Sequence, residues 1–228
     1  MGDDLTRPAF YALPSGGWRD YVTLLHPPYT LWHLSYAAMG ASVAPRMKWD
    51  VLGWTVLAFL LAMGIGAHAL DEIQGRPLRT RIPDRVLKML AAWSIAGACA
   101  IGIHVAIDST LWLLAFVVFG AFVVVAYNLE LFDGLLHTPL WFAGAWGAFP
   151  ALTAFFASAQ TIRAEAVGIA AFALVTSLVQ QRLSVEVRAA RRVAGDASLA
   201  RPAEAVLQLL SAGMPVLAGA LLLARWHY

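Results

Sequence analysis

Three ionisable residues stand together where a long apolar run ends. His68, Asp71 and Glu72 occupy positions i, i+3 and i+4, so a helix is expected to place them on one face. An ionisable residue at membrane depth is costly and marks a candidate site. Carboxylate oxygens are the ligands that Mg²⁺ takes, and the ion bridges them to phosphate oxygens. We therefore predict Asp71 and Glu72 as metal ligands and catalytic residues, with His68 beside them as a substrate-binding residue.

Arginines follow directly in the same segment. Arg76, Arg79 and Arg81 lie within ten residues of Asp71, and a guanidinium group can bind phosphate oxygens through two parallel hydrogen bonds. The same residues also suit a capped helix end followed by a basic loop on the cytoplasmic side of a membrane. The spacing leaves both interpretations open.

A second basic segment leaves a later apolar run. Arg182 and Glu186 form an i, i+4 pair, and Arg188 begins a further cluster of arginines. We predict all three as part of an anion-binding site for a diphosphate or an acidic headgroup. The alternative is a basic patch that contacts anionic lipid, at about 1 kcal/mol per basic residue.

A third polar segment lacks Lys and Arg. Tyr127 and Asn128 end an apolar run and are predicted to hydrogen-bond a ligand headgroup, whereas Asp133 and Gly134 form an ordinary turn pair.

The composition requires a membrane around these segments. Of the 228 residues, 60% are hydrophobic and 13% charged, against about 45–50% and about 25% in soluble domains. A span needs about 20 mostly apolar residues. We predict an all-α integral membrane protein with a single transmembrane domain over residues 1–228 and about seven transmembrane helices. The predicted spans are 29–45, 51–70, 87–106, 110–127, 138–158, 164–181 and 203–224.

The distribution of positive charge orients the chain. Seven spans place 12 of the 16 basic residues on one side, namely Arg7, Arg19, Arg76, Arg79, Arg81, Arg85, Lys88, Arg182, Arg188, Arg191, Arg192 and Arg201. Positive loops stay cytoplasmic, so residues 1–28 form a cytoplasmic N-terminal segment and the C-terminus lies outside. We expect a prokaryotic inner membrane, with membrane lipids as partners. Because the basic residues fall in loops, a nucleic-acid partner is not expected.

The order of these segments resembles the UbiA superfamily of intramembrane prenyltransferases. The resemblance covers about residues 18–200 and rests on the run 24–29, on Asp71 followed by the Arg-Pro-Leu run 76–78, and on the Tyr-Asn pair at 127–128. The family's first motif has Asn and two more Asp residues where this chain has Ala67, His68 and Gly75. The family's second Asp-rich motif follows the sixth span, and the corresponding segment of this chain contains no Asp cluster.

Two functions follow from the resemblance. The first is Mg²⁺-dependent prenyl transfer from an allylic diphosphate to a lipophilic acceptor, within a UbiA-like helical bundle. The second is a non-catalytic accessory subunit of a larger membrane-protein complex, or a scaffold that binds an isoprenoid, quinone or pigment. The missing aspartates favour the second function, as does a number of spans smaller than that of most family members. The polar residues kept at the expected places favour a retained headgroup site.

Overall fold

The computed structural model describes residues 7–193 and 199–226, without the side chains of 192 and 193. Within these ranges the chain is all-α and contains no strand. The helices are α1 (Trp18–Leu24), α2 (Pro27–Ser42), α3 (Trp49–Phe59), α4 (His68–Ile73), α5 (Asp84–Asp108), α6 (Leu113–Asn128), α7 (Pro139–Phe142), α8 (Phe149–Ala159), α9 (Ala164–Val193) and α10 (Arg201–Trp226), with the π-helical segments η1 (Leu60–Ala67) and η2 (Ala143–Ala148).

The two π-helical segments join neighbouring helices into longer rods. The segment η1 connects α3 to α4 in one rod over Trp49–Ile73, and η2 connects α7 to α8 over Pro139–Ala159. Wider π turns interrupt α-helices mostly at functional sites. Here η1 delivers α4, with His68 and Asp71, to the end of the bundle.

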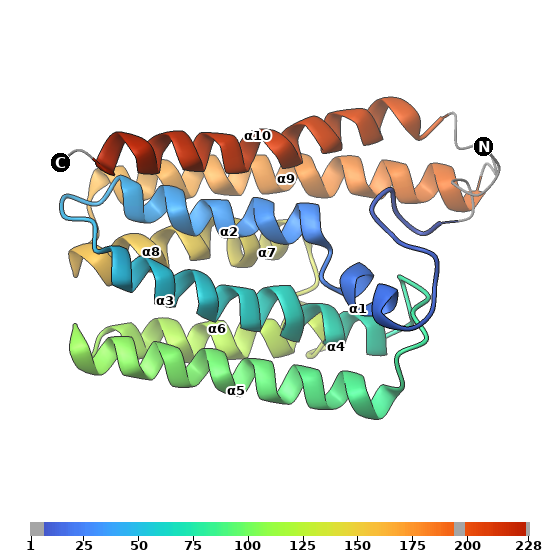
Figure 1. Ribbon diagram of the computed structural model, residues 1–228, viewed down its shortest axis with the longest axis horizontal. Helices are drawn as coiled ribbons and strands as arrows, with labels where there is room; N and C mark the ends of the chain where they lie inside the picture. The colour runs from blue at the N-terminus through green and yellow to red at the C-terminus, as the bar shows by residue number, and fades with distance from the viewer. Residues whose placement is uncertain (1–6, 194–198, 227–228) are drawn as a thin grey trace.

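The long helices run side by side along one axis (Figure 1). The helices α9 and α10 lie at one edge of the bundle and α5 lies at the other, with α2, α3, α6 and α8 between them. Helix α1, the 74–83 loop and the 129–138 loop gather at the end where α9 finishes, and the C-terminus lies at the opposite end. The polar segments identified in the sequence therefore meet at one end of the bundle.

Close packing holds α2 against α8. A Cβ atom added to Gly40 would lie 2.1 Å from the carbonyl oxygen of Ala151, so only glycine fits at this crossing. Trp32, Tyr36 and Phe155 are fully buried nearby. The Tyr36 hydroxyl lies 2.7 Å from the Thr176 hydroxyl and fixes α2 to α9 through a polar contact.

Five of the rods are long and apolar enough to cross a membrane, and they begin at Trp49, Asp84, Pro139, Ala164 and Arg201. Composition and length therefore indicate an integral membrane protein. The predicted spans 29–45 and 110–127 correspond to α2 and α6, which have 16 residues each and are about 24 Å long. Helix α2 ends at Ser42, three residues before the predicted end. Helix α9 continues to Val193, so the second basic segment is helical.

Candidate functional site

A polar cavity opens at the end of the bundle where the loops gather. It has two overlapping lobes of about 550 Å³ and about 570 Å³. Both lobes are lined by residues from the N-terminal segment, α2, α4 and α9, namely Tyr11, His26, Tyr29, Asp71, Ser184 and Arg188. The first lobe, called the basic lobe here, is also lined by Arg7, Arg76, Arg79, Arg191 and Glu204. The second, called the ring lobe, is also lined by His33, His68, Tyr127, His137, Phe142 and Trp146.

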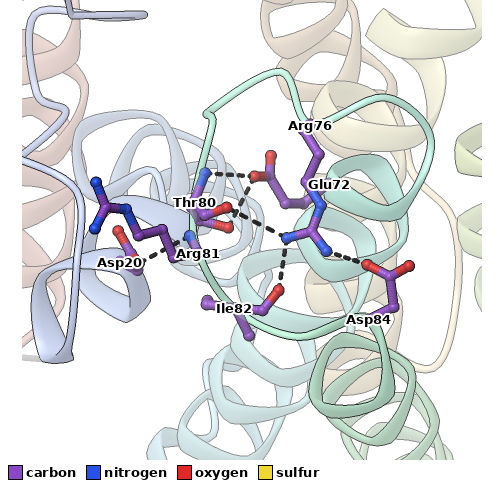
Figure 2. Close-up of polar contacts among 7 residues, drawn as sticks. All are labelled: Asp20, Glu72, Arg76, Thr80, Arg81, Ile82 and Asp84. Atoms are coloured by element: carbon purple, nitrogen blue, oxygen red, sulfur yellow. Dashed lines mark hydrogen bonds and ion pairs between the residues drawn. The ribbon is translucent and has the colours of Figure 1, made fainter.

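The neighbours Asp71 and Glu72 face different surroundings. Asp71 lines both lobes, and His68 lines the ring lobe. Glu72 has no exposed surface and turns toward the following loop. Its carboxylate accepts hydrogen bonds from the backbone N–H and the hydroxyl of Thr80, both at 2.8 Å (Figure 2). It also accepts one from the backbone N–H of Leu78 at 3.0 Å. His68 and Asp71 therefore both line the ring lobe, whereas Glu72 is absent from the cavity lining and is bound by the loop.

Arg76 also stabilises that loop. Its guanidinium donates to the carbonyl oxygen of Ile82 at 2.6 Å and forms an ion pair with Asp84 (Figure 2). Asp20 of α1 approaches from the other side and accepts from the backbone N–H of Arg81 at 2.9 Å. The seven residues drawn in Figure 2 are called the loop clamp below, namely Asp20, Glu72, Arg76, Thr80, Arg81, Ile82 and Asp84.

The loop clamp holds two arginines in an unusual backbone conformation. Arg76 and Arg79 both have a φ of 55°, in the left-handed region that non-glycine residues seldom adopt. Such strain persists only where surrounding contacts determine the conformation, and it clusters at ligand sites. Arg79 lines the basic lobe, whereas Arg81 contributes its backbone to the clamp and its side chain is absent from the cavity lining.

The predicted residues of α9 separate into two groups. Arg182 and Glu186 pair with each other at 3.2 Å, with the Arg182 side chain 80% exposed, and neither lines the cavity. Arg188 lines both lobes. Within the described part of the chain, its guanidinium makes no hydrogen bond or ion pair.

Tyr127 and Asn128 both line the ring lobe, where they were predicted to meet a headgroup. The Tyr127 ring stacks on His137, with 4.5 Å between centroids, and lies 4.6 Å from the Trp146 ring. The Asn128 amide donates to the carbonyl oxygen of Val124 at 2.6 Å. The turn predicted at 133–134 is present.

Histidines that sequence reasoning did not select form the deeper wall of the ring lobe. His26 stacks on His68, with 4.0 Å between centroids and 12° between planes. The Nδ1 atom of His68 donates to the carbonyl oxygen of Gly64 at 3.1 Å, and Nδ1 of His26 lies 2.8 Å from the Tyr11 hydroxyl. Nε2 of His26 and Nδ1 of His33 are buried without a hydrogen-bond partner. A ligand or bound water would satisfy such atoms.

Burial shifts the pKa of two cavity residues that lie outside the predicted membrane spans, His26 and Tyr11. It lowers the pKa of His26 well below the usual value, and the nearby His68 and Arg188 add to the effect. Burial likewise raises the pKa of Tyr11 well above its usual value, and Tyr29 adds to it. Both groups are therefore neutral at pH 7.

The cavity residues that were not predicted from the sequence differ in whether a sequence pattern could have identified them. His26, Tyr29 and His33 recur at three- or four-residue spacing, on a single face of α2 and its N-cap. That periodicity could have identified them. Tyr11 carries no such signal, because the tertiary fold alone brings the N-terminal segment over the cavity.

Two apolar pockets lie within the bundle. The smaller, of about 40 Å³, shares Trp146 with the ring lobe. The larger, of about 90 Å³, lies between α3, α5, α6 and α8 and is lined by residues such as Trp54, Cys99 and Phe116. The two pockets share Phe59, Ala62, Gly120, Val124 and Phe149. These two pockets, called the apolar path below, border the polar cavity at the shared residue Trp146.

The residues present fit a metal ion poorly. No group of three His, Cys, Asp or Glu side chains in the described ranges is arranged to hold one. Of the predicted ligands, Asp71 faces the cavity and Glu72 has all of its hydrogen bonds directed to the loop. The Mg²⁺ that the resemblance implies would therefore meet one of its two predicted carboxylates.

No family model matches the chain, and neither a curated protein nor a solved structure matches it significantly.

Proposed function

We propose that the chain is a UbiA-like membrane protein of seven transmembrane helices that binds an isoprenoid with an anionic, diphosphate-type headgroup. The observation that carries this proposal is the adjacency of an arginine-lined polar cavity and an apolar path. A polar headgroup attached to a long hydrocarbon chain needs both environments in this order.

The charge of the basic lobe supports an anionic headgroup. Five arginines line it, with Asp71 and Glu204 as its acidic residues. Glu204 is already paired with Arg191, at 2.7 Å. Arg76 is likewise paired with Asp84. Arg7, Arg79 and Arg188 therefore outnumber Asp71 in the lining, and this excess of positive charge favours an anionic ligand.

The apolar pockets support a hydrocarbon chain. Their walls are aliphatic and aromatic side chains of α3, α5, α6 and α8. Each methylene group transferred from water to such a wall contributes about 0.8 kcal/mol. Longer prenyl chains should therefore bind more tightly until the path is filled.

The proposed orientation follows the distribution of basic residues. The loops that carry most Lys and Arg gather at the cavity end (Figure 1), and positive loops remain cytoplasmic. The cavity then opens to the cytoplasm, the N-terminus is cytoplasmic and the C-terminus lies outside.

Binding of a chain-length series tests the proposal. Purified protein in lipid nanodiscs is titrated with geranyl, farnesyl and geranylgeranyl diphosphate, and affinity is expected to rise with chain length. Ala62 lines both apolar pockets, so Ala62→Phe should remove the dependence on length. Ala212→Phe, on the exposed surface of α10, is the matched control. Affinity that is absent, or independent of length in the wild type, would contradict the proposal.

Mg²⁺-dependent prenyl transfer to a lipophilic acceptor is the second candidate. The observation that favours it is the position of Asp71, which faces the cavity from α4. Mg²⁺, when bound, would stabilise the leaving diphosphate. Turnover that requires Mg²⁺ and disappears in Asp71→Asn would establish this reaction. Native mass spectrometry of protein from its own membrane tests the non-catalytic alternative, because an accessory subunit should retain partner subunits or pigments.

A further inference from the structure

We infer that the diphosphate headgroup is bound directly by arginine side chains, chiefly Arg188 and Arg79, without Mg²⁺. This inference rests on the proposed function and specifies what recognises the headgroup. It also departs from the Mg²⁺ dependence that the resemblance implies.

The acidic residues near the cavity are the first part of the argument. Glu72 is enclosed in the loop clamp, with both carboxylate oxygens accepting hydrogen bonds. Glu204 accepts two hydrogen bonds from Arg191, at 2.7 Å and 2.8 Å. Glu130 lies 3.9 Å from His137. Among the described residues that line the cavity, Asp71 is the carboxylate that remains without a hydrogen bond or ion pair.

A single carboxylate beside arginines is a poor site for a divalent cation. Asp71 lies within electrostatic range of Arg188, which also lines both lobes. A guanidinium group repels a second cation and compensates the carboxylate charge itself. The segment that follows the predicted sixth span contributes Arg188 to the cavity lining. It contributes no carboxylate, because Glu186 pairs with Arg182 outside the cavity.

The basic residues are the second part of the argument. Arg188 lies on the helix α9, and its guanidinium makes no hydrogen bond or ion pair with the described residues. A guanidinium presents its N–H groups as a planar fork that matches two phosphate oxygens. Charge-assisted bonds of this kind are about twice as strong as neutral ones.

The loop clamp supplies the second arginine. Arg79 sits between the residues that Glu72 binds, Leu78 and Thr80, and its backbone has a φ of 55°. The buried carboxylate thus fixes the backbone on both sides of Arg79. Arg79 lines the basic lobe, so the clamp holds the backbone of this residue beside the headgroup that we propose there.

The experiment uses the full chain in nanodiscs and radiolabelled geranylgeranyl diphosphate, with EDTA or with Mg²⁺ present. We expect equal affinity in both conditions. Arg188→Gln should weaken binding by about 10- to 100-fold, as expected for loss of hydrogen bonds to a charged group. Arg182→Gln is the matched control, because it removes an exposed arginine from the same helix, and its affinity should equal that of the wild type.

Geranylgeraniol, which lacks the diphosphate, separates the inference from the proposed function. It should bind wild type and Arg188→Gln equally well, which also shows that the variant is folded. Diphosphate binding that disappears in EDTA and returns with Mg²⁺ overturns the inference and leaves the proposed function intact. Equal diphosphate affinity of Arg188→Gln and wild type also overturns the inference. If neither the diphosphate nor the alcohol binds wild type, the proposed function fails as well.

Discussion

The loop clamp and the cavity wall, which includes Asp71 and Arg188, differ in whether their charged side chains are paired within the protein. In the clamp, Glu72 and Arg76 have partners within the protein. On the wall, Asp71 and Arg188 lack hydrogen bonds and ion pairs in the described ranges, although Asp71 precedes Glu72 in sequence. A buried carboxylate such as Glu72 needs hydrogen-bond partners within the protein, whereas Arg188 is exposed, so water can solvate its guanidinium. The clamp therefore contributes to stability, whereas the cavity wall is where we propose that a ligand binds.

The two regions are nevertheless connected through the 74–83 loop. The clamp fixes the backbone on either side of Arg79, and this residue reaches the basic lobe. A change in the clamp should therefore reduce stability first and affinity second, while a change in the wall should affect affinity alone.

The largest expected effect is that of Glu72→Ala. The substitution leaves three hydrogen-bond donors of Leu78 and Thr80 without their acceptor, and each buried unsatisfied group costs about 1–3 kcal/mol. We expect the free energy of unfolding to fall by about 3 kcal/mol or more. Thermal unfolding monitored with a thiol-reactive dye at Cys99, the only cysteine, measures this. A melting temperature equal to that of Asp71→Asn would abolish the distinction between clamp and wall.

Arg76→Gln should have an intermediate effect on stability. Arg76 is one-third exposed, so loss of its contacts with Ile82 and Asp84 should cost about 1–2 kcal/mol. The 74–83 loop should also open more often, and trypsin should cleave after Arg79 and Arg81 faster than in wild type. Arg188→Gln is the control, because its stability should remain within about 0.5 kcal/mol of wild type. Equal cleavage rates for all three proteins would show that Arg76 does not restrain the loop.

Acidification should destabilise the protein through His26. Its pKa is lowered in the folded state, so below its usual value of 6.5 the unfolded state takes up the proton first. Stability from this group is thus complete above about pH 6.5 and falls with decreasing pH, by at most about 1.4 kcal/mol per pH unit. Tryptophan fluorescence during thermal unfolding measures the slope. His26→Gln should reduce that slope, and an unchanged slope would remove His26 from the explanation.

Asp71→Asn should have the smallest effect on stability. Its carboxylate makes no hydrogen bond among the described residues, so the free energy of unfolding should change by about 0.5 kcal/mol or less. Diphosphate affinity should stay the same or increase, because a negative charge leaves the basic lobe. Scintillation binding measures the affinity. A large loss would instead indicate that Asp71 holds a metal ion, and it would favour the transfer reaction.

Much of the architecture could be predicted from the sequence, since hydrophobic runs of about 20 residues have few alternatives to membrane helices. Each predicted span coincides largely with a helical rod, and five rods meet the length and composition of a span. The ends of the helices were less predictable. Helix α9 runs three turns past its apolar part because its last turns pack beside α10, where Arg191 pairs with Glu204.

The sequence selected seven residues that the fold brings to one cavity, and their roles stay predictions. They are His68, Asp71, Arg76, Arg79, Tyr127, Asn128 and Arg188. Helical spacing could not separate Asp71 from Glu72, because the direction of each side chain depends on the loop that folds back over Glu72. Nor could it reveal the stacking of His26 on His68, which requires α2 and α4 to meet.

The sequence by itself determined that the chain is helical and apolar, and that its polar residues gather at the ends of particular helices. These properties depend on local composition and on the cost of exposing a backbone to lipid. The tertiary structure alone decided which charged groups are satisfied within the protein. That property depends on distances between segments far apart in the chain, such as Asp20 and Arg81. It distinguishes the carboxylate that stabilises a loop from the one that faces the polar cavity.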